Sequence, residues 1–248
     1  MKENKYDDNI FFQKYSQMSR SQQGLAGAGE WETLRKLLPD FKDKRVLDLG
    51  CGYGWHCIYA MEHGASSVVG VDISHKMLEV AKEKTHFPQV EYKCCAIEDV
   101  EFPEESFDVI LSSLAFHYVA DYEILVKKIY RILKSGGKLV FTVEHPVFTA
   151  YGTQDWYYNE KGEILHFPVD NYYYEGKRTA VFLGEKVTKY HRTLTTYLNT
   201  LLSNGFIINH IVEPQPPENM MDIPGMQDEM RRPMMLIVSA NKKVDRVK

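Results

Sequence analysis

The sequence of 248 residues is poor in cysteine, which argues against a disulfide-stabilised protein and against a cysteine-ligated metal site. Four cysteines are too few for a disulfide-stabilised scaffold of this length, and no two of them form a Cys-x-x-Cys pair. A His-Glu-x-x-His motif is also missing, so the sequence predicts no metal site. We expect reduced and mostly buried thiols, as is usual in a cytoplasmic protein.

A basic excess and a long apolar run are also missing. Lys plus Arg number 30 against 34 Asp plus Glu, giving a formal net charge of -4, which argues against a nucleic-acid partner. The longest stretch without formal charge, residues 193–212, is broken by Ser203-Asn204-Gly205 and does not suit a membrane span. The first eight residues hold no apolar segment typical of a secretory signal. The composition predicts a cytoplasmic globular protein with no membrane insertion.

From residue 45 the sequence alternates β-branched apolar runs with segments of helical periodicity. Strands are expected at 45–49, 68–71, 90–94, 107–111 and 138–143. Helices follow the first, second and fourth strands, and Gly136-Gly137 is expected to end the last of these helices. Strands joined by helices pair in parallel, so the sequence predicts a doubly wound α/β sheet with helices on both faces. Ligands bind such sheets outside the carboxyl ends of the strands.

Two segments depart from this alternation within what we interpret as one domain over residues 1–248. Residues 1–40 suggest helical turns that precede the sheet. Residues 146–190 contain eleven aromatic residues without regular periodicity, before a helix from 194 and strands from 206 and 234. This insert leaves the sheet at its ligand-binding edge, which favours a lid over the substrate. An extra packing layer or a dimer surface is the alternative, and both a monomer and a homodimer stay open.

The most informative motif is the glycine-rich run Asp48-Leu49-Gly50-Cys51-Gly52-Tyr53-Gly54. Glycines directly after a strand let the backbone turn tightly and approach a ligand. A nicotinamide-dinucleotide fingerprint would need its third glycine at Trp55, and the Asp48 carboxylate would repel a pyrophosphate. The same carboxylate attracts an ammonium or a sulfonium group. The motif therefore predicts a ligand that is cationic at this end.

A second acid, Asp72, closes the second expected strand 22 residues after Gly50. In nucleotide-binding sheets an acid at this place accepts hydrogen bonds from the hydroxyls of a ribose. The alternative is that Asp72 only caps the following helix. Two acids at strand ends of one sheet, beside the glycines, favour ligand binding.

These motifs, with Phe107-Asp108-Val109-Ile110 and Leu133-Lys134-Ser135-Gly136-Gly137, resemble the class I S-adenosylmethionine-dependent methyltransferases. The small-molecule branch, similar to ubiquinone and menaquinone biosynthesis methyltransferases, is the most similar. The resemblance covers residues 30–145 well and 190–241 more loosely. It implies a Rossmann-like seven-stranded sheet with an antiparallel last strand, S-adenosyl-L-methionine as co-substrate, no metal, and methyl transfer to a small-molecule acceptor.

Carried over by position, the resemblance also assigns the cofactor contacts. The glycine run would hold the methionine part, Asp72 the ribose, and the residues after strands two and three the two sides of the adenine. Glu98 stands near the place where many relatives carry an Asp for the adenine amino group. The implied cofactor-binding residues are Asp48, Leu49, Gly50, Cys51, Gly52, Gly54, Asp72, Ile73, Met77, Ala96, Ile97, Glu98, Ser113, Leu114 and His117.

Methyl transfer requires alignment of the acceptor, exclusion of water and removal of a proton when the acceptor carries one. The candidate general bases are His117 after strand four and His145 after strand five, because a neutral imidazole near pH 7 suits that task. Glu144 and His191 are further candidates. For each histidine the alternative is a packed imidazole without a chemical role.

Two other functions stay open: a protein or tRNA methyltransferase, and a cofactor-binding regulatory protein that has lost catalysis. The Asp/Asn/Ser-Pro-Pro-aromatic motif of DNA adenine and cytosine-N4 methyltransferases is missing, because Ser112-Ser113-Leu114-Ala115 follows strand four. The pattern leaves open which acceptor is used and which of its atoms is methylated.

Overall fold

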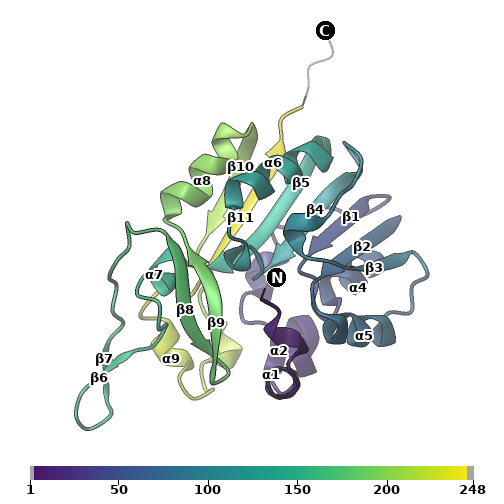
Figure 1. Cartoon of the computed structure of the whole chain (residues 1–248). Coiled ribbons are helices and arrows are strands. Elements are labelled where there is room, and N and C mark those ends of the chain that lie inside the picture. The colour runs from purple at the N-terminus through teal and green to yellow at the C-terminus, as the bar shows by residue number, and fades with distance from the viewer. Residues whose placement is uncertain (1–2, 245–248) are drawn as a thin grey trace.

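A seven-stranded mixed sheet forms the centre of the computed structural model, which describes residues 3–244 (Figure 1). The strand order is β10-β11-β5-β4-β1-β2-β3, and all strands except β11 run parallel to one another. The sheet confirms the predicted fold class, including the antiparallel last strand. Its strands are β1 (Arg45–Leu49), β2 (Ser67–Asp72), β3 (Val90–Cys94), β4 (Phe107–Ser113), β5 (Leu133–Glu144), β10 (Phe206–Val212) and β11 (Met235–Lys242).

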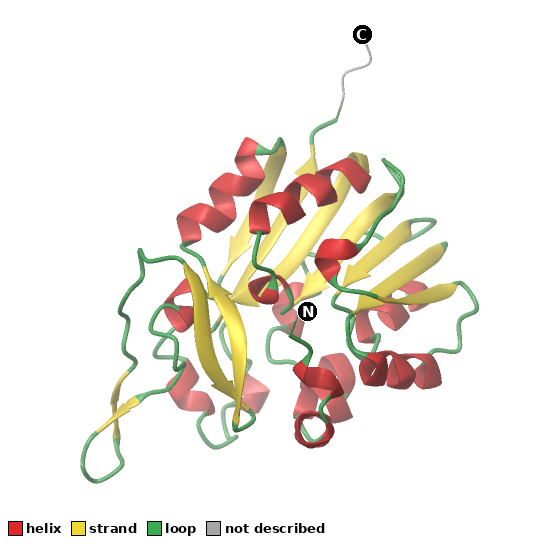
Figure 2. Ribbon diagram, in the orientation of Figure 1, coloured by secondary structure: helices red, strands yellow, loops and turns green. Residues whose placement is uncertain are grey.

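Helices cover both faces of this sheet (Figure 2). One face carries α6 (Tyr122–Ile132) and α8 (Leu194–Ser203), and the other carries α4 (Trp55–Glu62) and α5 (His75–Lys84). The sequence of α6 is amphipathic: its buried residues recur three and four positions apart and so share one side of the helix. The core therefore has two layers, one on each side of the sheet.

The junction between α6 and β5 differs from the expectation. The helix ends at Ile132 and β5 begins at Leu133, so the prediction that Gly136-Gly137 ends the helix is wrong. Gly136 has φ +73°, and a Cβ on Gly137 would lie 2.8 Å from the Leu133 side chain. The glycines instead form an irregularity within β5, where its register with β4 shifts.

Two groups of short elements lie beyond the carboxyl ends of the parallel strands (Figure 1). The N-terminal segment contains η1 (Lys5–Asp7), α1 (Asn9–Ser16), α2 (Ser19–Gln22), η2 (Gly24–Gly27) and α3 (Trp31–Leu34). The insert contains α7 (Pro146–Thr149) and two antiparallel hairpins, β6 (Tyr157–Tyr158) with β7 (Ile164–His166) and β8 (Gly176–Phe182) with β9 (Glu185–His191). The remaining short helices are η3 (Ile97–Asp99), η4 (Phe116–Tyr118), η5 (Glu218–Met220) and α9 (Met226–Glu229).

The N-terminal segment packs directly against the insert. Phe11 of α1 is fully buried beside Ala180 and Val187 of the β8–β9 hairpin, and its ring centroid lies 5.8 Å from that of Phe182. Lys14 also donates a hydrogen bond to the Leu183 carbonyl at 2.9 Å. These two sequence-distant segments therefore cover the same end of the sheet. Within residues 3–244, none of the helices has the length and apolar character required to span a membrane.

Candidate functional site

A cavity of about 380 Å³ lies at the carboxyl ends of β1, β2, β3 and β4. The loops after these strands form one wall, and Glu144 at the end of β5 contributes to it. Eleven of the fifteen predicted cofactor-binding residues line this cavity: Gly50, Gly52, Asp72, Ile73, Met77, Ala96, Ile97, Glu98, Ser113, Leu114 and His117. The fold thus brings together residues that are spread over 68 positions of the sequence, from 50 to 117.

The other four predicted residues do not reach the cavity. Leu49 is fully buried in the core, and Cys51 and Gly54 pack beneath the loop. Asp48 is 1% exposed, and burial raises its pKa to about 7. Its Oδ2 accepts a hydrogen bond from Cys57 Sγ at 3.5 Å, whereas its buried Oδ1 has no hydrogen-bond partner among the described residues. Asp48 therefore lies below the glycine run, and its side chain does not line the cavity.

Backbone conformation explains why glycine is required in this loop. Gly50 has φ +79°, and a Cβ there would overlap the Cβ of Ala115. Gly52 has φ +53°, and a Cβ there would meet no atom within 4 Å because this residue faces the cavity. The first glycine is therefore needed for packing, and the second leaves open space where a ligand can approach the backbone.

Asp72 connects the glycine run to the start of α5. Its Oδ2 accepts a hydrogen bond from the Gly52 N–H and its Oδ1 accepts one from the Ser74 N–H, both at 2.9 Å. Burial raises the pKa of Asp72. The N-cap of α5 is Ser74 and not Asp72: Ser74 Oγ accepts a hydrogen bond from the Met77 N–H at 3.1 Å. A carboxylate has about four lone-pair sites, so Asp72, which accepts hydrogen bonds from the backbone of Gly52, Ile73 and Ser74, can still accept one from a ligand.

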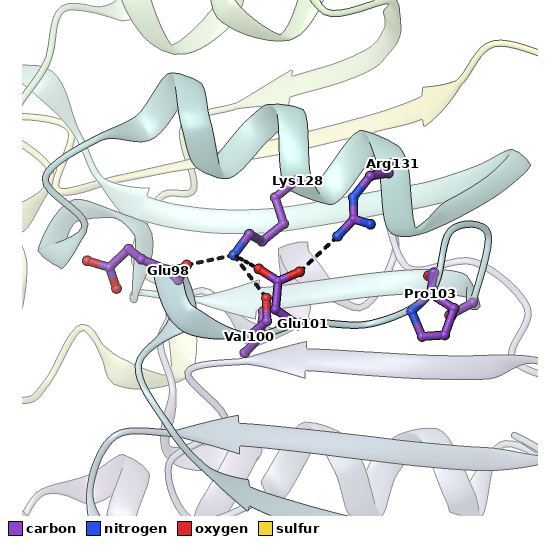
Figure 3. Close-up of polar contacts among 7 residues, drawn as sticks. Glu98, Val100, Glu101, Pro103, Lys128 and Arg131 are labelled. Atoms are coloured by element: carbon purple, nitrogen blue, oxygen red, sulfur yellow. Dashed lines mark hydrogen bonds and ion pairs between the residues drawn. The ribbon is translucent and has the colours of Figure 1, made fainter.

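The loop after β3 is held from the opposite side by Lys128 of α6. Lys128 Nζ donates hydrogen bonds to the carbonyls of Glu98 and Val100, at 2.7 and 3.0 Å, and to Glu101 Oε1 at 2.8 Å (Figure 3). Arg131 binds the second oxygen of Glu101 at 3.1 Å. This cluster fixes the backbone that carries Ala96, Ile97 and Glu98 into the cavity wall. The sequence pattern gave no signal for Lys128.

His117 lines the cavity, but its geometry does not favour a general base. The ring is 2% exposed, and burial lowers its pKa to about 4. Its Nδ1 accepts a hydrogen bond from the backbone N–H of Glu144 at 3.3 Å. A neutral imidazole that accepts at Nδ1 carries its proton on Nε2. The remaining nitrogen is therefore a hydrogen-bond donor, without a lone pair for a proton from an acceptor.

The two other candidate histidines do not line the cavity. His145 is the N-cap of α7: its Nδ1 accepts the Val147 N–H at 3.1 Å, and its Nε2 lies 2.8 Å from Glu213 Oε1. His191 Nδ1 lies 2.7 Å from Thr149 Oγ1. Its Nε2 lies 2.8 Å from the Tyr172 carbonyl. Both rings contact groups of the insert, and neither lines the cavity.

Glu144 is the candidate that does reach the cavity from β5. Its Oε1 lies 2.5 Å from Lys189 Nζ, and its Oε2 accepts a hydrogen bond from Gln154 Nε2 at 2.6 Å. Burial opposes ionisation of Glu144, but the Lys189 ammonium and the hydrogen bonds from Lys189 and Gln154 outweigh it and hold the pKa of Glu144 below its ordinary value. The cavity therefore carries an ionised carboxylate beside the neutral His117 ring.

The rest of the wall comes from residues that the sequence did not single out as site residues. The N-terminal segment contributes Tyr6, Tyr15, Met18 and Arg20, and the chain before and within β11 contributes Met234 and Met235. The remaining wall residues are mostly apolar or aromatic and include Tyr118, Val119, Phe182, Val187 and Tyr190. Tyr6 and Tyr118 meet across the cavity with their hydroxyl oxygens 3.2 Å apart. No periodic pattern marks these residues, because they approach the site only through tertiary packing.

The N-terminal segment is attached to the start of α5 by Asp7. Its Oδ1 accepts hydrogen bonds from Ser74 Oγ at 2.6 Å and from the Lys76 N–H at 3.1 Å. Asn4 adds a hydrogen bond to the Ile73 carbonyl at 3.2 Å. These contacts place the segment over the residues that follow Asp72. Across residues 3–244, no group of three or more His, Cys, Asp or Glu side chains is arranged to hold a metal ion.

The known proteins that this chain is similar to are methyltransferases. The methyltransferase domain family matches residues 47–141. A Listeria monocytogenes protein assigned to the S-adenosylmethionine-dependent methyltransferases is 58% identical, with a TM-score of 0.85 over 89% of this chain and 99% of its own. A Mesorhizobium loti S-adenosylmethionine-dependent methyltransferase is 40% identical, with a TM-score of 0.82. This match covers 88% of this chain and 100% of the Mesorhizobium chain. The ubiquinone biosynthesis O-methyltransferase of Coxiella burnetii is 36% identical over 44% of this chain and 47% of that protein.

Proposed function

The chain belongs to the S-adenosylmethionine-dependent methyltransferases, and from this premise we propose that its methyl acceptor is a small molecule. The observation that carries the proposal is the cavity itself. Its volume of about 380 Å³ is that of a small-ligand site, and the N-terminal segment and the β8–β9 hairpin both contribute to its wall. A macromolecular acceptor would need an open approach to the same atoms. The partial similarity to a ubiquinone biosynthesis O-methyltransferase supports the same acceptor class.

We propose that the sheet side of the cavity holds S-adenosylmethionine. The residues fit this group: Gly52 leaves open space at the glycine run, and Asp72 can still accept a hydrogen bond from a ribose hydroxyl. Ile73, Met77 and Ala96 supply apolar surface for an adenine. When bound, S-adenosylmethionine supplies a methyl group on a positively charged sulfur. The ionised Glu144 carboxylate of the wall favours a cationic ligand there.

We propose that an apolar or aromatic acceptor occupies the side between β4, β5 and the insert. Tyr118, Phe182, Val187 and Tyr190 give this side its apolar and aromatic character. The two polar side chains on this side of the cavity, His117 and Glu144, then have complementary roles. His117 donates from Nε2 to the acceptor and orients it, and the Glu144 carboxylate takes the proton of a hydroxyl or amine acceptor. Closure of the apolar wall excludes water from the reacting atoms.

We also propose a role for the insert and a location for the protein in the cell. Residues 146–190 act as a lid, because the β8–β9 hairpin contributes Phe182, Val187 and Tyr190 to the wall. We place the protein in the cytoplasm, where its four free cysteines remain reduced.

The decisive experiment uses methyl-labelled S-adenosylmethionine with a cell extract split into metabolite, protein and RNA fractions. We expect label in the metabolite fraction with the unaltered protein, and strongly reduced label with Asp72→Ala. Calorimetric titration with S-adenosylhomocysteine should show that Asp72→Ala weakens binding by about 1–3 kcal/mol. Label confined to protein or tRNA would support the macromolecular alternative. Binding of S-adenosylhomocysteine without turnover on any fraction would support a regulatory protein.

A further inference from the structure

Three side chains at the junction of the sheet and the insert form a closed set of hydrogen bonds, the Glu144 cluster. Lys189 Nζ of β9 donates to Glu144 Oε1 at 2.5 Å and to Gln154 Oε1 at 2.8 Å. Gln154 Nε2 in turn donates to Glu144 Oε2 at 2.6 Å. Glu144 ends β5 of the sheet, whereas Gln154 and Lys189 belong to the insert. Each carboxylate oxygen of Glu144 therefore has a partner from the insert.

Burial separates the roles of the two charged members of this cluster. The Glu144 side chain is 13% exposed and lines the cavity, whereas the Lys189 side chain is 3% exposed and does not line it. The Lys189 ammonium lies 5.9 Å from the ring centroid of Tyr118 and 5.4 Å from that of Phe182. Both rings stabilise its positive charge. Lys189 therefore acts on Glu144 and does not itself face a ligand.

Gln154 makes its contacts from a strained backbone conformation. Its φ is +62°, in the left-handed region that few residues other than glycine, asparagine and aspartate adopt. Such a conformation persists where surrounding contacts compensate a cost of about 1–3 kcal/mol. The hydrogen bonds of the Gln154 side chain with Glu144 and Lys189 are contacts of this kind. The strain thus coincides with the place where the insert binds Glu144.

The other titratable groups around Glu144 are neutral at pH 7, which leaves its ionisation to the Glu144 cluster. Burial lowers the pKa of His117 to about 4 and raises the pKa of Tyr118 and of Tyr197. Lys189 supplies the positive charge in contact with Glu144. A carboxyl group buried without such a partner binds a proton, because burial disfavours its charged form. A protonated Glu144 cannot accept a proton from a methyl acceptor.

We propose that Lys189 and Gln154 are positioning residues that keep the Glu144 carboxylate ionised and oriented toward the methyl acceptor. The inference rests on the proposed function, in which Glu144 takes the proton of the acceptor. In that step the lone pair of the acceptor forms the bond to the methyl carbon, and the carbon–sulfur bond breaks with its electron pair left on sulfur. The proton released by the acceptor passes to Glu144. The insert thus takes part in the chemistry, in addition to covering the site.

The first test needs no acceptor. Lys189→Met keeps the length of the side chain without its charge, and Lys186→Met changes an exposed lysine of the same strand as the matched control. Carbon-13 NMR follows the titration of the carboxyl groups, and the signal of Glu144 is identified by its loss in Glu144→Gln. We expect Glu144 to titrate at higher pH in Lys189→Met and at its original pH in Lys186→Met. Gln154→Leu should shift the titration in the same direction by less, because it removes a hydrogen bond but no charge.

The second test follows the transfer of label from methyl-labelled S-adenosylmethionine to the metabolite fraction of a cell extract as the pH is raised. At pH 7 we expect Lys189→Met to be about 10- to 100-fold slower than the unaltered protein, with the rate recovering at higher pH as Glu144 ionises. Lys189→Arg should retain more of the rate at pH 7, because it keeps the positive charge. Binding of S-adenosylhomocysteine should change less than about twofold, because its sulfur carries no charge for Glu144 to attract.

Three outcomes would overturn the inference. A rate lowered equally at every pH, with Glu144 titrating as in the unaltered protein, would show that Lys189 only supports the fold. An unchanged titration and rate would show that Glu144 is ionised without Lys189. A shifted titration without a shifted rate profile would show that Glu144 does not take the proton. If Lys189→Met fails to fold by circular dichroism, Lys189→Gln and Gln154→Leu decide in the same way.

Failure of the proposed function would give a different result. In that case the unaltered protein would transfer label to none of the fractions of the extract. The NMR titration would still decide whether Lys189 and Gln154 keep Glu144 ionised, because it requires neither cofactor nor acceptor.

Discussion

The two sides of the cavity are built in different ways. On the sheet side, hydrogen bonds to backbone groups hold the loops: the N–H groups of Gly50 and Cys51 both bind the Val71 carbonyl, at 2.8 and 3.0 Å. On the covering side, side chains meet across segments that are remote in sequence, as Tyr6 meets Tyr118. Every residue except proline supplies a backbone N–H donor and every residue a C=O acceptor, so hydrogen bonds to the backbone depend little on the side chains of the loop. A cover fixed by side chains can open and can change its residues without loss of the sheet.

The largest expected effect separates two roles of glycine on the sheet side. In Gly50→Ala the new Cβ overlaps Ala115 and the backbone is held at φ +79°, so we expect the free energy of unfolding to fall by about 2–4 kcal/mol. In Gly52→Ala only the backbone strain applies, about 1 kcal/mol, but the methyl group enters the cavity. Urea unfolding and titration with S-adenosylhomocysteine measure the two effects. Equal stability of the two variants would contradict the packing role of Gly50.

A slightly smaller effect concerns the buried His56 below the glycine run. Burial lowers its pKa from 6.5 to about 4, and its Nε2 has no hydrogen-bond partner among the described residues. Between these values the unfolded chain binds a proton that the folded chain does not, so stability falls as the pH falls. The expected loss is about 1.4 kcal/mol per pH unit within this window.

The variant His56→Gln isolates this contribution. His117 has the same shift, and Asp48, whose pKa is raised to about 7, acts in the opposite direction. The unaltered protein should therefore lose about 2 kcal/mol more than His56→Gln when urea unfolding is moved from pH 7 to pH 5. Identical pH dependence in the two proteins would show that His56 is protonated in the folded state.

A moderate effect is expected where the covering side is attached. Asp7→Ala removes the hydrogen bonds to Ser74 Oγ and to the Lys76 N–H, which we expect to cost about 1 kcal/mol. Amide exchange in residues 5–22 should become faster, while exchange in β1 and β4 stays unchanged. Asp8→Ala is the comparison variant: it removes the N-cap of α1 but no hydrogen bond to α5, so it should speed exchange within α1 only, whereas Asp7→Ala should also speed exchange in the first turn of α5. Equal acceleration at the start of α5 in both variants would place the attachment elsewhere.

The smallest effect tests the lid. Saturation with S-adenosylhomocysteine and a methyl acceptor should slow amide exchange in residues 176–191, whereas β1 and β4 are already protected and barely change. Exchange should respond less in the β6–β7 hairpin, because none of its residues lines the cavity. If exchange across the whole insert is unaffected by ligand, the packing or dimer-surface alternative would remain.

The contrast between the two sides also explains what the sequence could predict. The glycine run and Asp72 were identifiable because strand ends and positive-φ turns have local sequence signals. Tyr6 and Arg20 had no such signal, since their place depends on how residues 3–34 fold back over the sheet. His145 lies outside the cavity wall for a local reason: the following Pro146 begins a helix, and the imidazole caps it. The Lys128 cluster was invisible because it binds backbone carbonyls, which any sequence supplies.

The position of β11 has a consequence for how the chain folds while it is being synthesised. β11 pairs with β5 on one side and with β10 on the other, so β10 has no neighbour in the sheet until residues 235–242 are available. A ribosome delivers the N-terminal part first, at roughly 5–20 residues per second. Until the last strand arrives, the nascent protein presents β5 as an open, apolar sheet edge, and such edges promote association between chains. Final insertion of β11 closes this edge and brings Met235 to the cavity. The step that protects the nascent chain is thus the step that completes the site.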